Sequence, residues 1–351
     1  QASPIVWGDQ VIVTTSFWPE GKTQKEFAEH HVTCYATKDG KQLWDATVAQ
    51  GSWLLSDLRG GYTAPTPVTD GERIYALFGS GVIAAFDMGG KPLWRKEIPD
   101  PKKFDVAIGA SPVLYGDTVL ILCDKVSKSS HLLALDKKTG NEKWDEKRPT
   151  VNFSHTTPVL AKIAGKEQLL IGSSNALQGV DPTNGKVLWW ANNEGDVCCP
   201  VFGGGLVYCD SGRGGGFGIA VDPTGTGDVS KTHVKWKTEK KVGGLGSAVI
   251  SGEYLYRMRD PGLLTAYKLA SGELVFEERV QGVSTTASPF ATADGLVYFA
   301  SAGRSIVVKV GPKAEILATN ELGEENGASA AVANGRIYLK GRNHLFAIGK
   351  K

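Results

Sequence analysis

The chain has 351 residues, a formal net charge of +2 from 39 basic and 37 acidic residues, 44 glycines and 9 tryptophans. Because basic and acidic residues are almost equal in number, the net charge gives no electrostatic basis for nucleic-acid binding. No apolar run reaches the length of a membrane-spanning helix. Abundant glycine together with abundant aromatics predicts short strands joined by tight turns rather than helices.

A unit of two short strands around a glycine-containing turn recurs along the chain, as in residues 111–120. Its first strand begins at a small polar residue. Packing and backbone hydrogen bonding are enough to explain this residue type, so it need not bind a ligand. The eight copies begin near Ser3, Thr66, Ser111, Thr157, Cys199, Ser247, Ser288 and Ser329. Their spacing of roughly 40 to 60 residues is typical of four-stranded blades in a radial repeat.

A second unit follows most copies of the first and is clearest at residues 134–144. An apolar strand ends at an aspartate that caps the turn, a glycine takes the positive-φ position, and an aromatic residue follows the glycine by four. The glycine–aromatic pairs are Gly40 and Trp44, Gly90 and Trp94, Gly140 and Trp144, Gly185 and Trp189, and Gly272 and Phe276. A looser copy with a longer turn runs from Val221 to Trp236. We expect each aromatic ring to pack on the neighbouring blade.

These repeats predict an all-β chain that forms a single domain over residues 1–351, an eight-bladed β-propeller of four-stranded antiparallel blades. The blades are expected to start near residues 3, 64, 110, 156, 198, 246, 287 and 328. The eighth copy stops after an apolar stretch at residues 345–348, and a closing strand would have to precede Gln1. We therefore expect three strands in the last blade, or an irregular closure, with an open edge that favours aggregation.

The motif Ala-x-Asp-x-x-Thr-Gly-x-x-x-Trp at residues 134–144 resembles the repeat of the pyrroloquinoline-quinone (PQQ) propeller superfamily, and the resemblance covers essentially the whole chain. That superfamily includes quinone-dependent alcohol dehydrogenases, a lipoprotein of the outer-membrane barrel-assembly machinery and uncharacterised exported proteins. The resemblance implies a periplasmic or secreted protein. Because one propeller fold serves such different activities, function has to be argued from a site.

The loops before the first strand and between the second and third strands of each blade are expected to share one rim, called here the top face, where a propeller usually binds ligands. Arginines recur in these loops from the fifth blade to the eighth, and converging guanidinium groups would bind carboxylate, phosphate or sulfate. The slightly favoured alternative is that each is a solvated loop charge. The candidate ligand-binding residues are Trp53, Arg59, Tyr62, His155, Glu194, Asp196, Arg213, Arg257, Arg259, Arg304, Arg342 and His344.

The adjacent cysteines Cys198 and Cys199 are the candidate cofactor-binding residues. The resemblance implies this role, because quinone-dependent alcohol dehydrogenases carry an adjacent-cysteine disulfide stacked against PQQ at the start of an inner strand. The arginine that follows the pair in those enzymes is replaced here by glycines. The favoured alternatives are two free thiols, or a bond between Cys199 and Cys209.

No metal site is expected from the sequence. Five cysteines without CxxC spacing argue against zinc. The calcium that a quinone enzyme needs would depend on Glu194 and Asp196, which share one short loop. His30 and His31 lie in an insertion at residues 16–31, and adjacent histidines of a strand point to opposite faces.

We therefore expect an exported, monomeric, non-catalytic propeller without a cofactor that binds a partner protein, a glycan or a small anionic ligand at its top face. No nucleic-acid partner and no membrane span are expected. The alternative is a PQQ- and calcium-dependent oxidoreductase that uses Cys198 and Cys199. A weaker third hypothesis is an enzyme that acts on a polysaccharide through His155, Glu194 and Asp196.

Overall fold

The structure is a computed structural model that describes residues 2–55, 61–98, 108–124, 129–151, 154–212, 215–239, 243–324 and 327–349. The chain divides into two compact units. The first contains Gln1–Thr150, Ala331–Tyr338 and Ala347–Lys351, and the second contains Val151–Ala330 and Leu339–Phe346. All regular secondary structure in these described ranges is β-strand, and none of it is a helix able to cross a membrane.

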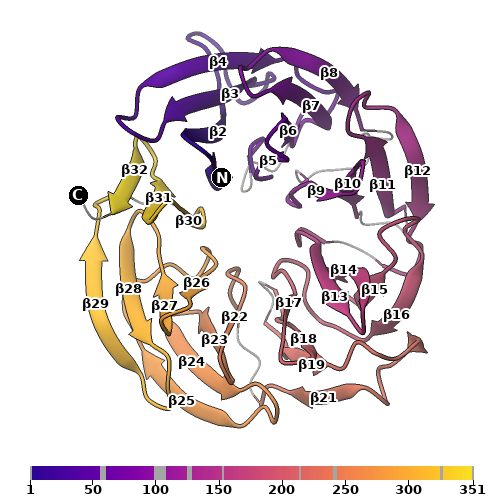
Figure 1. The fold of residues 1–351 in the computed structure, drawn as a ribbon, viewed down its shortest axis with the longest axis vertical. Coiled ribbons are helices and arrows are strands. Elements are labelled where there is room, and N and C mark those ends of the chain that lie inside the picture. The colour runs from indigo at the N-terminus through magenta and orange to yellow at the C-terminus, as the bar shows by residue number, and fades with distance from the viewer. Residues whose placement is uncertain are drawn as a thin grey trace. The chain divides into compact units, whose positions relative to one another are not determined.

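Three four-stranded antiparallel sheets lie wholly in the first unit, and the strands of each sheet are adjacent in chain order (Figure 1). The first sheet contains β1 (Ile5–Trp7), β2 (Gln10–Phe17), β3 (Glu29–Ala36) and β4 (Gln42–Val48). The second contains β5 (Val68–Thr69), β6 (Arg73–Phe78), β7 (Val82–Asp87) and β8 (Pro92–Glu97). The third contains β9 (Val113–Tyr115), β10 (Thr118–Cys123), β11 (His131–Asp136) and β12 (Glu142–Lys147).

Four further sheets lie wholly in the second unit. The fourth sheet contains β13 (Val159–Ile163), β14 (Lys166–Gly172), β15 (Leu177–Val180), β16 (Val187–Ala191) and the short β20 (Gly227–Asp228). The fifth contains β17 (Val201–Gly203), β18 (Leu206–Cys209), β19 (Ile219–Val221) and β21 (Val234–Lys237). The sixth contains β22 (Val249–Ser251), β23 (Tyr254–Arg259), β24 (Leu263–Lys268) and β25 (Leu274–Arg279). The seventh contains β26 (Phe290–Thr292), β27 (Leu296–Phe299), β28 (Arg304–Lys309) and β29 (Glu315–Glu321).

The eighth sheet has three strands within the described ranges: β30 (Ala331–Ala333), β31 (Arg336–Lys340) and β32 (Leu345–Gly349). These sheets are the blades of an eight-bladed β-propeller. The predicted all-β fold class, the eight blades and the missing fourth strand of the last blade are therefore confirmed.

Burial within a blade follows the order of its strands. All six residues of β10 are buried, and so are the first five of β11. In β12 the exposed residues alternate with half-buried ones, as expected of a strand with one face in solvent. In this blade the middle strands are therefore largely apolar and buried, while the fourth strand keeps charged residues on its exposed face and the half-buried Trp144 on the other.

The repeated tryptophan joins neighbouring blades as predicted. Trp44 donates its indole N–H to the carbonyl of Met88 at 3.1 Å, and a Cβ placed on Gly90 would lie 2.5 Å from the Trp44 ring. Trp94 donates in the same way to Lys137 at 2.9 Å and covers Gly140. In the second unit the same arrangement joins Trp236, Leu269 and Gly272. Each of these glycines is therefore required for two reasons: its backbone has a positive φ, and the absence of a side chain leaves room for the tryptophan ring.

The small polar residues at the starts of the first strands also join neighbouring blades. In the first unit the backbone N–H of Ser3 donates to Thr66 Oγ1, and that of Thr66 donates to Ser111 Oγ. In the second unit the N–H groups of Thr157, Cys199, Ser247 and Ser288 donate to the side chains of Cys199, Ser247, Ser288 and Ser329. The backbone hydrogen bonding expected at these positions is confirmed.

The long turn of the fifth blade has a role that the repeat alone does not reveal. Its residues Gly227 and Asp228 form β20, which pairs in parallel with Trp189 and Trp190 of β16. The N–H of Val229 then donates to the Trp190 carbonyl at 2.9 Å. The inserted residues therefore give the fourth blade a fifth strand and help to bury Trp189.

Candidate functional site

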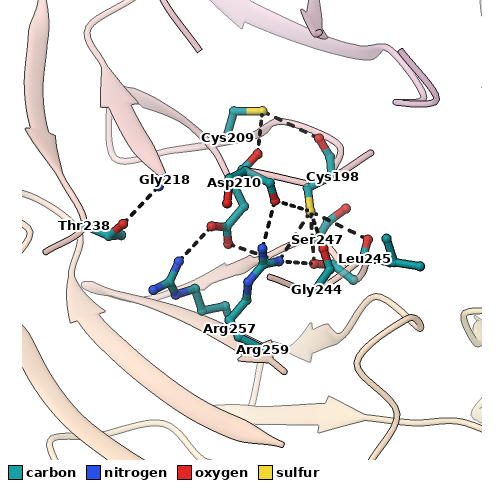
Figure 2. A network of polar contacts seen from close by, with 12 residues as sticks. Cys198, Cys209, Asp210, Gly218, Thr238, Gly244, Leu245, Ser247, Arg257 and Arg259 are labelled. Carbon is teal, nitrogen blue, oxygen red and sulfur yellow. Dashed lines mark hydrogen bonds and ion pairs between the residues drawn. The ribbon is translucent and has the colours of Figure 1, made fainter. Parts of the chain in front are cut away.

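Two arginines predicted to bind an anion converge in the second unit on one internal carboxylate, Asp210 (Figure 2). Arg257 and Arg259 are alternate residues of β23 and extend from the same face of that strand. Asp210 directly follows β18, and its side chain, like those of both arginines, is almost completely buried. This buried cluster, called here the Asp210 cluster, also includes Cys198.

Arg257 is held by several acceptors at once. Its Nη1 atom lies 2.7 Å from Asp210 Oδ1 and 3.2 Å from the hydroxyl of Tyr208, and its Nη2 atom donates to the hydroxyl of Tyr267 at 3.0 Å. Its Nε atom donates to Thr265 Oγ1 at 3.1 Å. Burial alone would lower the pKa of Arg257, but Asp210 outweighs it and the pKa is raised, so the guanidinium remains charged.

Arg259 binds mainly backbone atoms. Its Nη2 atom donates to the Ser211 carbonyl at 2.8 Å, and its Nη1 atom donates to the Gly246 carbonyl at 3.3 Å and lies 3.8 Å from Asp210 Oδ2. These bonds fix the loop before β22 against the end of β18. Both guanidinium groups are buried and bind acceptors of the protein itself, so neither is exposed to an external anion.

Cys198 completes the cluster. Its sulfur lies 3.4 Å from Arg259 Nη1 and within 3.3–3.7 Å of four backbone carbonyl oxygens. Burial, together with the negative charge of Asp210, raises the pKa of the Cys198 thiol to about 12. The thiol therefore stays protonated at neutral pH and is no nucleophile.

The five cysteines are free thiols, and four of them, Cys34, Cys123, Cys198 and Cys209, are buried. Of the interpretations left open for Cys198 and Cys199, the structure has the two free thiols, without a bond between Cys199 and Cys209. Cys199 Sγ accepts a hydrogen bond from the N–H of Thr157 and serves the contact between first strands.

The surroundings of Cys198 do not fit a stacked quinone. Backbone carbonyls and Arg259 surround its sulfur, and the two nearest guanidinium groups already bind Asp210, side-chain hydroxyls and backbone carbonyls. Within the described ranges, no three histidine, cysteine, aspartate or glutamate side chains lie together in a way that could hold a metal ion. The residues at this position are a packed structural cluster.

Two candidate residues of the first unit, Trp53 and Tyr62, lie in its core. Trp53 and Tyr62 are 3 % and 2 % exposed. Trp53 covers Gly81, while the Tyr62 hydroxyl accepts the N–H of Leu55 at 3.2 Å. Trp18 from the inserted loop contacts Tyr62 with its ring edge. These aromatics therefore anchor loops rather than present a binding surface.

The candidates His155, Glu194 and Asp196 are brought together in the second unit. The N–H of His155 donates to the Asp196 carbonyl at 2.6 Å. Glu194 and Asp196 pack against the glycine-rich segment after β18, because a Cβ on Gly216 would lie 2.5 Å from Glu194 Oε2 and one on Gly212 would lie 2.0 Å from Asp196 Oδ1. Glu194 itself is exposed.

Three further candidates among the described residues lie outside the Asp210 cluster. Arg304 lies 3.7 Å from Glu321, His344 pairs with Glu324, and Arg342 is exposed. Arg59 and Arg213 lie outside the described residues.

The sequence interpretation missed the carboxylates that neutralise buried arginines. A signal was present, because the dipeptide Cys-Asp ends a second strand twice, at Cys123-Asp124 and at Cys209-Asp210. In the first unit Asp124 accepts two hydrogen bonds from Arg148, at 2.9 and 3.2 Å, and both side chains are buried. At both of these positions the aspartate that directly follows the strand forms a buried ion pair.

Comparison with known proteins agrees with this fold. A BamB from Moraxella catarrhalis is 15% identical, with a TM-score of 0.70 over 99% of this chain and 92% of that one. A quinohemoprotein alcohol dehydrogenase from Pseudomonas putida HK5 is 14% identical, with a TM-score of 0.65 over 96% of this chain and 69% of that one. A europium-containing methanol dehydrogenase is 13% identical, with a TM-score of 0.55 over 96% of this chain and 81% of that one.

Curated protein sequences give no match. The family model described as outer membrane protein assembly factor BamB matches residues 28–273, which is more than half of the chain. The resemblance to the PQQ-like propeller superfamily is thereby confirmed, and the chain belongs to the BamB-like family of that superfamily.

Proposed function

We propose that this protein is an exported, non-catalytic propeller of the periplasm that binds a partner protein through its top-face loops. The observation that carries the proposal is the match of residues 28–273 to a family described as an assembly factor for outer membrane proteins. A scaffold of that kind needs a rigid framework and exposed loops, not a reactive group.

The Asp210 cluster supports a protein partner over a glycan or a small anion. Arg257 and Arg259 were predicted anion ligands of these loops, but both are buried and already bind Asp210 and other acceptors of the protein. The same cluster supports a scaffold over the alternative PQQ-dependent oxidoreductase, because Cys198 is a protonated, enclosed thiol. Exposed loop residues such as Glu194 and Arg342 then provide the contact surface.

Site-specific photo-cross-linking in the native cell tests this proposal. A photoreactive amino acid at position 194 or 342 should cross-link to a protein of the outer-membrane assembly pathway, identified by mass spectrometry. The matched control is position 138, an exposed lysine in a turn between a third and a fourth strand. Equal cross-linking from position 138, or no cross-linked protein from 194 and 342, would contradict the proposal.

A second arm addresses the oxidoreductase. Titration with PQQ and excess Ca²⁺ should leave the quinone absorbance and the melting temperature of the protein unchanged. A saturable shift that survives Cys198→Ala would point to a quinone site elsewhere, and one that Cys198→Ala abolishes would establish the alternative.

A further inference from the structure

A cavity of about 400 Å³ lies between the second and third blades, both of which belong to the first unit. Three turns form its wall, at residues 70–73, 116–117 and 136–138. The first two turns join the first and second strands of their blades, and the third joins β11 to β12. The cavity is therefore at the edge of these blades opposite the top-face loops, and its volume is within the range of small-molecule sites.

One difference between the repeats explains why this cavity exists. In the first blade Trp7 precedes the turn, and a Cβ on Gly71 of the second blade would lie 2.4 Å from its ring. Asp70 takes the equivalent place before the turn of the second blade. A Cβ on Gly116 of the third blade would meet no atom of the described residues within 4 Å. An aspartate in place of a tryptophan therefore leaves the space between the second and third blades open.

Asp70 and Lys137 form a partly buried ion pair in the wall, with Lys137 Nζ 3.0 Å from Asp70 Oδ2. Asp70 also accepts two backbone N–H groups of its own turn, at 2.8 and 3.1 Å, and the hydroxyl of Tyr75. Burial alone would raise the pKa of Asp70, but Lys137 and these N–H groups outweigh it and the pKa is lowered. The carboxylate therefore remains ionised at neutral pH, and the ion pair persists.

Most other charges of the wall are paired as well. Glu72 Oε2 lies 3.0 Å from Arg73 Nη1, and Lys143 binds Asp117. Lys138 is exposed and has no carboxylate partner among the described residues. With Lys143 included, carboxylates and basic groups are equal in number, so the wall exerts no strong net field on a charged ligand.

The wall nevertheless has free hydrogen-bonding capacity. A carboxylate has about four acceptor positions and an ammonium group three donors, of which an ion pair uses only a part. Glu72, Asp117 and Lys138 are all exposed at the cavity. A hydroxyl group both donates and accepts, so a neutral ligand with several hydroxyl groups can bind both kinds of side chain without breaking an ion pair.

An exposed tryptophan adjoins this wall. Trp7 is 49% exposed, and its ring lies over Gly71, whose two neighbours in the chain, Asp70 and Glu72, line the cavity. A pyranose ring has an apolar C–H face that can stack on an indole and hydroxyl groups that extend to polar partners. A polar cavity beside an exposed indole has the chemistry that a sugar requires.

We propose that this cavity binds a neutral saccharide. One sugar ring occupies the cavity, with its hydroxyl groups bonded to Glu72, Asp117 and Lys138, and an adjoining ring stacks on Trp7. The site lies apart from the top-face loops to which the partner protein is assigned, so the inference goes beyond the proposed function.

Isothermal titration calorimetry of the full 351-residue protein tests this inference with four neutral disaccharides: maltose, cellobiose, lactose and diacetylchitobiose. At least one should bind saturably, with a Kd of about 1 mM or tighter. Raising the NaCl concentration from about 0.05 to about 0.5 M should change this Kd less than about twofold, because the ligand carries no charge to be screened.

Lys138→Ala removes an exposed donor and should weaken binding about three- to tenfold. Lys38→Ala is the matched control, because Lys38 is the exposed lysine at the same position of the equivalent turn in the first blade, and it should bind like the wild type. Trp7→Ala should also weaken binding about three- to tenfold, whereas Trp7→Phe keeps an aromatic face and should retain most of the affinity. Circular dichroism melting curves establish that each variant is folded.

The inference is overturned if none of the four disaccharides binds, or if Lys138→Ala or Trp7→Ala binds like the wild type. Glucuronate and glucosamine, which add a charge to glucose, should bind no more tightly than glucose itself. Tighter, salt-sensitive binding of either charged sugar would assign the cavity to an ionic ligand instead. None of these results affects the cross-links expected from positions 194 and 342, so the two proposals fail separately.

Discussion

Gly140 shows how a single residue type carries the contact between blades. Its φ of +72° is unfavourable for other residues, and a Cβ would lie 2.7 Å from the ring of Trp94. Gly116 has a comparable φ but no described atom near its Cβ position. Substitution by alanine would therefore strain the backbone at both sites, but of the two only the substitution at Gly140 would also clash with a ring.

We expect Gly140→Ala to lower the free energy of unfolding by about 1–3 kcal/mol more than Gly116→Ala does, the usual cost of overpacking. Urea unfolding followed by tryptophan fluorescence measures the difference. Equal losses in the two variants would mean that Trp94 moves aside without cost.

His30 gives the protein a predicted dependence of stability on pH. Its ring is buried, with Nδ1 2.9 Å from Ser16 Oγ and Nε2 2.7 Å from Ser80 Oγ, and it stacks on Phe78. Burial lowers the pKa of His30 from 6.5 to about 4. In the unfolded chain His30 therefore becomes protonated near pH 6.5, whereas in the folded protein it becomes protonated only near pH 4.

Stability should consequently fall as the pH decreases from about 6.5 to about 4, by about 3 kcal/mol from this residue, and then level off. His30→Gln should remove most of this slope in urea unfolding between pH 7.5 and 4.5. His233→Gln, at a half-buried histidine of the second unit, should keep it. An unchanged slope in His30→Gln would refute the assignment.

At the scale of strands, the Asp210 cluster holds β18 and β23 together. Asp210→Ala would leave the guanidinium groups of Arg257 and Arg259 buried without their carboxylate. We expect a loss of about 3–5 kcal/mol in the free energy of unfolding, as for other buried ion pairs broken on one side. Asp294→Ala, at an exposed turn residue, is the control and should cost little. A small loss for Asp210→Ala would show that water replaces the carboxylate.

The same cluster explains why part of the candidate site could not be predicted. The sequence places Arg257 and Arg259 two residues apart in a strand, so a common face was predictable. It does not place Asp210 opposite them, because that contact joins different blades, 47 residues apart. An arginine at these positions could be a solvated loop charge or part of a buried ion pair. Only the tertiary contact with Asp210 decides between the two.

At the scale of whole blades, the open edge of β32 predicts uneven hydrogen exchange. Amides of β32 should exchange much faster than those of β11, the equivalent third strand of a complete blade, because β32 has no fourth strand in the described structure to cover it. Mass spectrometry of deuterated peptides measures both segments. Equal protection of β32 and β11 in the free protein would contradict an open edge.

The sequence by itself determined the blades of this protein. Positive-φ glycines, capping aspartates and aromatics at a fixed spacing act within about ten residues, and local backbone sterics and turn chemistry need no further information. The missing fourth strand of the eighth blade followed from the same count. The tertiary structure alone decided which polar groups are bound inside the protein, such as Arg257, Arg259 and Cys198. Those outcomes depend on contacts between residues distant in the chain, where burial sets whether a charge is neutralised or exposed.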